Sequence, residues 1–224
     1  EVPPEVFTTE WKNPVNETRQ DFRPHMAQAM RLLNEAGWTL QGKRLLNAKG
    51  EQLKVEFLMP MSEITGVVEV YVTELKSLGI DARIRVVDSA QYQRRILSRD
   101  FDSIIDRLDQ SFSPGNEQRE FWSTAAADMP GSYNAMGLKN PAVDKLIDKV
   151  IFAPDRAELV AATKALDRVL QWNHLIVPHW DYPYERIAYW DIFGRPAKTP
   201  SQTVSVLRTW WIDDVKLKAV RAGK

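Results

Sequence analysis

The chain has 224 residues, of which 44% are hydrophobic, and it carries 30 Lys and Arg residues against 30 Asp and Glu residues. This length and apolar content allow a substantial core, in one large domain or two small ones. Zero net charge gives no general attraction to nucleic acid or an anionic membrane, so we expect no nucleic-acid partner. The absence of cysteine excludes disulfides and thiolate metal sites.

The N-terminal end does not have the pattern of a signal peptide, and no apolar run approaches the roughly 20 residues that span a bilayer. The chain begins at Glu1 and Val2 without a methionine, so we expect a fragment of a longer protein. Residues 1–23 carry aromatics and prolines without a stable period, which predicts an extended lead-in.

The first half of the chain predicts alternating helices and strands. Met26, Met30 and Leu33 recur at helical spacing between Pro24, which is tolerated in a first helical turn, and a stop at Gly37. The next segments are a hairpin over 43–56 leading into a strand that ends near Pro60, a helix over 64–78, a strand over 80–86, a helix over 90–97 and a strand over 102–106. Connections of this length imply parallel pairing of the strands.

The second half predicts two consecutive helices and then strands. Asn140 and Pro141 are typical of an N-cap and a first helical position, and a capping-box pattern at Asp155 opens the next helix, which runs to about residue 173. Residues 176–181 and 186–190 read as strands separated by a turn. We therefore predict an α/β fold with a mixed, largely parallel sheet flanked by helices.

The polar loop after the strand over 102–106 is the strongest candidate for a binding site. Ligands of α/β sheets bind outside the carboxyl ends of parallel strands, and this strand delivers four polar residues to that edge: Arg107, Asp109, Gln110 and Ser111. A carboxylate can pair with a ligand ammonium, and a guanidinium can pair with a ligand carboxylate. The alternative is that Arg107 and Asp109 form a structural ion pair that holds the loop.

Metal and catalytic signals are weak. The nearby histidines His174 and His179 are five residues apart and separated by Pro178, which does not suit a zinc pair on a helix, so we expect no metal and no cofactor. The sequence has no Gly-x-Ser-x-Gly motif and no phosphate-binding glycine loop. A hydrolase domain that uses Asp106 or Asp109 stays open as an alternative function, as does a protein-interaction module that uses the 107–118 loop.

A cluster of aromatic residues near the C-terminal end gives a second, weaker signal. Trp180 and Tyr182 lie at alternate positions, so one side of an extended segment would present both rings. Such rings can form the wall of a cleft for an amphipathic ligand, or they can fill a core.

The order of several segments resembles the C-terminal part of the bacterial oligopeptide- and dipeptide-binding proteins that serve ABC importers. These segments are 26–38, 74–82, 101–116, 140–147, 156–173 and 176–178, within a span of about residues 24–190. Residues 110–118 are most similar to the YejA-like branch of that family. The resemblance implies a two-lobed protein that closes on a peptide between its lobes, with a missing N-terminal lobe.

The resemblance also bears on the ligand contacts. In better-known relatives the matching strand is followed by a tryptophan and then an aspartate that holds the amino terminus of the ligand, whereas this chain has Arg107 and Gln110 at those positions. Asp109, one residue away, could take the role of the aspartate, and Arg107 would favour an anionic or C-terminal group. Asn116 and Asn134 are secondary candidates for contacts, and Trp180 and Tyr182 are candidates for the wall.

These observations lead to one hypothesis about function. We predict a lead-in over 1–23, a ligand-binding lobe over 24–185 and a segment over 186–224 that returns toward the missing lobe. The protein is expected to be a non-enzymatic, periplasmic solute-binding component, with a signal peptide outside this fragment. Its expected partners are a peptide or peptide-like ligand, the membrane permease of an ABC importer, and the N-terminal lobe.

Overall fold

The computed structural model describes residues 2–60, 64–179, 184, 186–198 and 205–223. The chain divides into two compact units, Glu1–Val177 and Pro178–Lys224. The sequence-based boundary of the ligand lobe at residue 185 stays a prediction. Among the helices described, none is long and apolar enough to cross a membrane.

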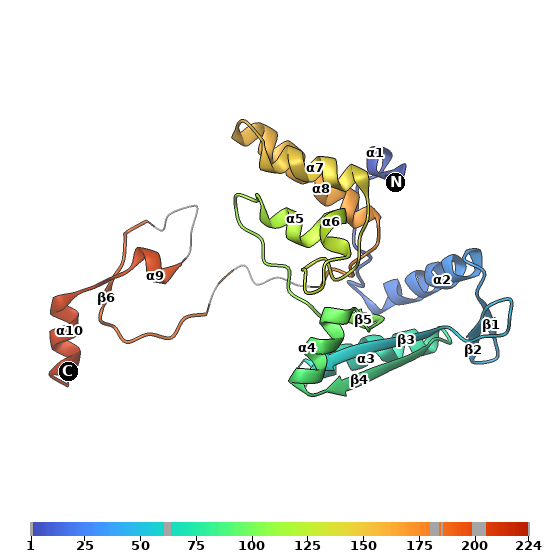
Figure 1. Ribbon diagram of the computed structural model, residues 1–224. Coiled ribbons are helices and arrows are strands. Elements are labelled where there is room, and N and C mark those ends of the chain that lie inside the picture. The colour runs from blue at the N-terminus through green and yellow to red at the C-terminus, as the bar shows by residue number, and fades with distance from the viewer. Residues whose placement is uncertain (1, 61–63, 180–183, 185, 199–204, 224) are drawn as a thin grey trace. The chain divides into compact units, whose positions relative to one another are not determined.

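One half of the first unit is built on a parallel sheet of three strands (Figure 1). β3 (Lys54–Pro60) lies between β4 (Asp81–Val87) and β5 (Ser103–Ile104), and it pairs with both in parallel. The connections between these strands contain α3 (Thr65–Ser77) and α4 (Ser89–Ser98). The predicted parallel pairing is therefore confirmed, although β5 is shorter than the strand expected over 102–106.

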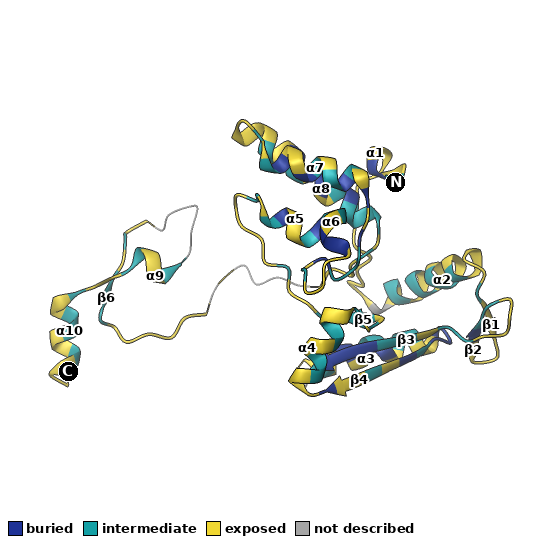
Figure 2. Cartoon of the chain, viewed as in Figure 1, coloured by how far each residue is buried: buried dark blue, intermediate teal, exposed yellow. Residues whose placement is uncertain are grey.

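One face of the sheet is buried under two helices. Phe57 and Met59 of β3 pack with Val68 and Val72 of α3, and the apolar side of α2 (Arg19–Glu35) covers the same cluster. Leu58 is fully buried on the opposite face of β3, because successive strand residues point to opposite sides. Figure 2 shows β3 as a largely buried strand.

α2 begins earlier than the sequence pattern predicts. Thr18 and Asp21 form a capping box in which Asp21 accepts a hydrogen bond from the Thr18 backbone at 2.7 Å. Pro24 therefore lies inside the helix and not in its first turn, so the start predicted at Pro24 is wrong. The capping box satisfies backbone N–H donors at the N-terminal end of α2. The missing N–H of Pro24 removes one hydrogen bond inside the helix.

A short hairpin leads into the sheet. β1 (Thr39–Gln41) pairs antiparallel with β2 (Arg44–Leu46), and a turn at 47–50 connects β2 to β3. Leu45 is fully buried, and its backbone N–H donates to the carbonyl oxygen of Gly79 at 2.8 Å. An antiparallel bridge also joins Leu46 to Gln52 across the turn at 47–50, so the hairpin expected over 43–56 is present and the β1–β2 hairpin precedes it. The strand ending at Pro60 is confirmed.

The other half of this unit is helical. α7 (Pro141–Ile151) and α8 (Arg156–Trp172) confirm the two predicted helices, and Asn140 and Asp155 cap them as expected. They share a core with Trp122 of α5 (Glu117–Trp122), which is followed by α6 (Thr124–Ala127).

The N-terminal residues differ from the expected extended lead-in. They contain the short helix α1 (Glu5–Thr8). Arg168 of α8 holds this segment by donating to the carbonyl oxygen of Val6, and to that of Thr9 at 2.6 Å.

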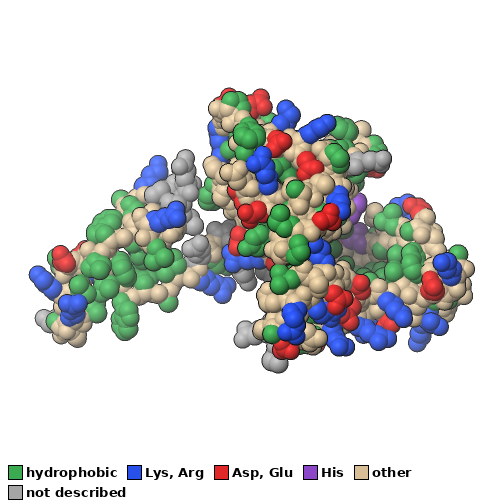
Figure 3. Space-filling view, in the orientation of Figure 1, with side chains coloured by type: hydrophobic (Ala, Val, Ile, Leu, Met, Phe, Trp, Pro, Cys, Tyr) green, Lys and Arg blue, Asp and Glu red, His purple; other side chains and the backbone are tan. Residues whose placement is uncertain are grey.

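The second unit is small, and its described residues leave much of their surface exposed. It contains β6 (Phe193–Gly194) paired with β7 (Trp211–Ile212), and the helices α9 (Val206–Thr209) and α10 (Asp214–Arg221). None of its described residues is buried, and hydrophobic side chains gather on it in Figure 3. Residues 176–179 and 186–190 form no strand, so the two predicted strands are wrong where they are described; an extended segment needs a pairing partner, and Pro178 also removes a donor.

Candidate functional site

The candidate site is the segment 105–116, which we call the rim loop. It leaves β5 after Ile104, has no regular secondary structure, and ends at Asn116, the N-cap of α5. Because β3, β4 and β5 are parallel, their carboxyl ends lie at one edge of the sheet, and the rim loop starts at that edge. Asp102 fixes the start of β5 by accepting a hydrogen bond from the backbone of Glu56 at 2.8 Å.

Arg107 and Asp109 form an ion pair within the rim loop. The guanidinium Nε lies 2.6 Å from the Asp109 carboxylate, and the two side chains are 87% and 74% exposed. A pair this exposed contributes about 0–1 kcal/mol to stability. Both charges belong to the same loop, so the pair does not tie the loop to another element, and both groups stay accessible to a ligand.

Three contacts outside that pair hold the rim loop in place. Gln118 of α5, which is buried, donates to the side-chain oxygen of Gln110 at 2.7 Å. Arg156, the first residue of α8, donates to the carbonyl oxygen of Phe112 at 2.9 Å. Glu117 accepts from the backbone N–H of Gly115 at 2.8 Å. The loop is therefore anchored to α5 and α8.

The sequence analysis missed the anchoring residues Gln118 and Arg156. Gln118 precedes the buried Trp122 by four residues and so lies on the same face of α5, which is the signal that could have identified it. Arg156 carries no local signal, because its acceptors lie more than forty residues away in the chain.

The remaining candidate contact residues have different surroundings. Ser111 is exposed, and its hydroxyl accepts from the backbone of Ser113 at 3.3 Å. Asn116 is exposed at the start of α5 and makes no side-chain cap. Asn134 is fully buried, so we assign it a structural role and leave it out of the proposed contacts. Trp180 and Tyr182 lie outside the described residues.

Asp106, a candidate catalytic residue, lies at the base of the rim loop. Its carboxylate accepts from the backbone N–H of Arg107 at 2.8 Å. Burial raises the pKa of the nearby Tyr92 hydroxyl, and the charge of Asp106 adds to that effect. Asp106 thus caps the turn that follows β5.

Of the residues considered for metal binding, His174 has a well-defined environment in the described part of the chain. His174 follows α8 with a φ of 53° and packs against the rings of Trp11 and Trp172. Within the residues that the structure describes, no group of three or more His, Cys, Asp or Glu side chains could hold a metal ion.

Comparisons with known proteins place the chain. Residues 2–129 match the family described as "Bacterial extracellular solute-binding proteins, family 5 Middle". The chain is 48% identical over 212 residues to the probable peptide-binding protein YejA of Agrobacterium fabrum, covering 94% of this chain and 34% of that protein. It is 31% identical over 210 residues to the peptidoglycan-binding protein YepA of the same organism, with the same coverage. The chain thus spans about a third of the length of these curated relatives.

Solved structures agree on the fold. The oligopeptide-binding protein AppA of Bacillus subtilis, solved with a nonapeptide, superposes with a TM-score of 0.64 at 15% identity, covering 93% of this chain and 40% of AppA. DppA of Helicobacter pylori, solved with the peptide STSA, gives a TM-score of 0.52 at 18% identity, covering 66% of this chain and 27% of DppA. The predicted fold class, an α/β lobe like those of periplasmic binding proteins, is confirmed.

Proposed function

This chain belongs to the bacterial extracellular solute-binding proteins of family 5, and we propose from that premise that it forms part of the substrate-binding component of an ABC importer. The proposed component captures oligopeptides or peptide-like solutes and performs no chemistry on them. The observation that carries the proposal is the rim loop, which presents accessible charges of both signs at the carboxyl edge of the parallel sheet.

The ligand chemistry follows from the two exposed charges. In the proposed complex the Asp109 carboxylate binds the ammonium of a peptide, and the Arg107 guanidinium binds a carboxylate, which replaces their mutual ion pair. Gln110, Ser111 and Asn116 supply polar groups for the peptide backbone. Relatives named for peptides and for peptidoglycan, whose cross-links are short peptides, support this ligand class.

The remainder of the cleft belongs to a longer polypeptide in this proposal. The segment 186–224 returns toward an N-terminal lobe, and Leu207 and Val215, which are 93% and 78% exposed in the second unit, pack against that lobe. Closure of the two lobes would bury the ligand. The loaded protein would deliver its ligand to the membrane permease from the periplasm.

Calorimetry with a library of short peptides, on the full-length protein, tests the proposal. Saturable binding without turnover supports it. Asp109→Asn should weaken a peptide with a free amino terminus by about tenfold, which is the loss of one charge-assisted hydrogen bond. The N-acetylated form of the same peptide should bind equally to the variant and the parent protein.

A matched control comes from another exposed ion pair, Arg31 with Glu35 on α2. Glu35→Gln should leave peptide affinity unchanged. Residues 1–224 alone should bind at least about tenfold more weakly than the full-length protein, because part of the buried interface is absent. If no peptide binds, the proposal is rejected, and product formation that Asp109→Asn abolishes would support the hydrolase alternative.

A further inference from the structure

Arg99 has an unusual backbone at the end of α4. Its φ of 54° and ψ of 34° are left-handed, a conformation that an L-residue other than glycine adopts at a cost. Among the described residues, Arg99 and His174 are the two non-glycine positions with positive φ. A strained backbone persists where the surrounding contacts hold it, so we expect contacts of the Arg99 side chain to hold this conformation.

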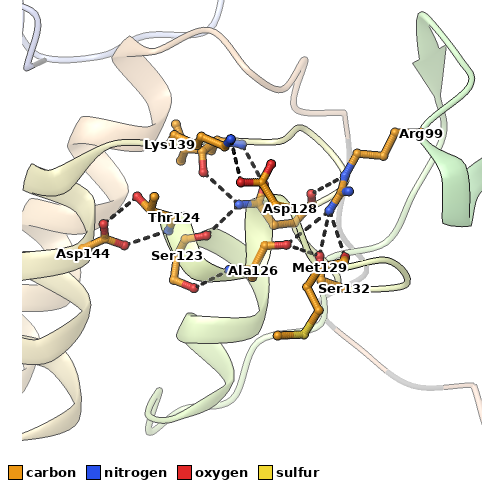
Figure 4. A network of polar contacts seen from close by, with 11 residues as sticks. Arg99, Ser123, Thr124, Ala126, Asp128, Met129, Ser132, Lys139 and Asp144 are labelled. Atoms are coloured by element: carbon orange, nitrogen blue, oxygen red, sulfur yellow. Dashed lines mark hydrogen bonds and ion pairs between the residues drawn. The ribbon is translucent and has the colours of Figure 1, made fainter.

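The Arg99 guanidinium binds the segment 126–134, which contains the end of α6 and the residues after it (Figure 4). Nη2 donates to the carbonyl oxygens of Ala126 and Met129, both at 3.2 Å, and to the hydroxyl of Ser132 at 3.0 Å. Nε donates to the carbonyl oxygen of Asn134 at 3.3 Å. One side chain thus connects the end of α4 to four residues of a distant segment.

That segment is itself fixed to the helical half of the unit. Thr124 donates through its backbone and its hydroxyl to Asp144 of α7, at 2.8 and 2.6 Å. Lys139 pairs with Asp128 at 2.7 Å. Figure 4 shows these contacts together with those of Arg99, so the guanidinium reaches α7 through a continuous set of bonds.

The rim loop connects the same two parts of the molecule along the chain. It follows β5, which begins four residues after Arg99, and it ends at α5, which leads directly into α6. The hydrogen bonds of Arg99 therefore connect the half of the unit that contains the sheet to the half that contains α5 to α8. The rim loop connects the same two halves along the chain. The rim loop has no secondary structure of its own, and the Arg99 hydrogen bonds are contacts that join the two parts of the molecule at its ends.

We infer that Arg99 is a positioning residue, which holds the two ends of the rim loop at a fixed separation and so orients Asp109 toward the ligand without touching it. The inference rests on the proposed peptide-binding function. The left-handed backbone of Arg99 then serves ligand binding as well as stability.

Two variants test the inference in the full-length protein. Arg99→Gly removes the guanidinium and tolerates the left-handed backbone. Ser132→Ala removes one acceptor from the opposite side, and it decides the matter if Arg99→Gly does not fold. Arg94→Ala on the exposed side of α4 is the control and should change nothing.

Amide exchange of residues 105–116 and calorimetry with tetra-alanine are the measurements. In Arg99→Gly we expect exchange in the rim loop and the dissociation constant to rise about tenfold each, with smaller changes of the same sign in Ser132→Ala. Added to Asp109→Asn, the Arg99→Gly change should cause little further loss of affinity, because both act through Asp109. Losses that add fully, or a rim loop with unchanged exchange, would overturn the inference.

Failure of the proposed function has a different signature. If the parent protein does not bind tetra-alanine, the exchange experiment still decides the role of Arg99 in holding the loop. Faster exchange in the variants then supports that role, and unchanged exchange rejects it.

Discussion

Replacement of the buried Asn134 should cost the protein a large part of its stability. Its amide Nδ2 donates to the carbonyl oxygens of Ser123 and Leu138, both at 3.0 Å, and its Oδ1 accepts from the Leu138 backbone N–H at 2.9 Å. The side chain has no exposed surface. Asn134→Ala leaves the carbonyl oxygen and the N–H of Leu138 without these buried partners, whereas the Ser123 carbonyl oxygen keeps the hydrogen bond that it accepts from the Ala126 N–H at 3.1 Å.

The magnitude follows from the two Leu138 groups. Each buried backbone group left unpaired costs about 1 kcal/mol or more, so Asn134→Ala should lower the free energy of unfolding by about 2 kcal/mol or more. Equilibrium urea unfolding followed by tryptophan fluorescence measures the loss, and the slope with urea should stay unchanged.

Asn47 provides a matched control. Its side chain also makes three hydrogen bonds, two from the backbone N–H groups of Lys49 and Glu51 and one to the Glu51 carboxylate, but it lies in a surface turn. Water replaces those partners after Asn47→Ala, so the expected loss is about 1 kcal/mol or less. Equal losses in the two variants would refute the argument that burial, rather than the number of bonds, sets the cost.

Two further predictions concern local structure. The hydrogen bond from the Thr18 backbone, followed by that from its hydroxyl, holds the pKa of Asp21 below its ordinary value of 3.8. The capping box therefore stabilises α2 above that pH and loses its effect as the pH falls below it, so the protection of the first-turn amides of α2 against exchange should fall at pH values below 3.8, and Asp21→Asn should abolish this dependence. Gly79→Ala should lower the free energy of unfolding by about 2 kcal/mol or more, because φ is +86° and a Cβ would lie 2.8 Å from the backbone nitrogen of Leu45. Gly50→Ala, with φ +79° and no atom within 4 Å, should cost only about 1 kcal/mol; a loss as large as that of Gly79→Ala would contradict the steric argument.

The elements with a strong local pattern could be predicted from the sequence. α3, β4, α7 and α8 each carry an apolar stripe or alternation that depends only on neighbouring residues, and the structure confirms all four. Parallel pairing followed from the length of the connections. The family resemblance was confirmed by the comparisons.

The features that depend on distant contacts could not be predicted. β5 ends after two residues because only Ser103 and Ile104 pair with β3, and no local pattern announces that limit. Asn134 lies in a segment without periodicity, so its complete burial had no sequence signal. α2 starts before Pro24, at Arg19, because the capping box of Thr18 and Asp21 opens the helix and Pro24 is accommodated inside it.

Five of the candidate contact residues lie in the rim loop, and their role in binding stays a prediction: Arg107, Asp109, Gln110, Ser111 and Asn116. The structure shows that the charges of Arg107 and Asp109 are accessible. It adds the anchors Gln118 and Arg156, which lie outside that segment.

The contacts that anchor the rim loop to α5 and α8 do not involve the charged side chains of Arg107 and Asp109. Arg156 donates to the carbonyl oxygen of Phe112, and Glu117 accepts from the N–H of Gly115, so much of the anchoring uses main-chain atoms of the loop and not its side chains. The side chains at 107 and 109 can therefore be exchanged at little cost in stability. In the proposed binding function, the charges at these two positions could therefore be changed without rebuilding the loop that carries them.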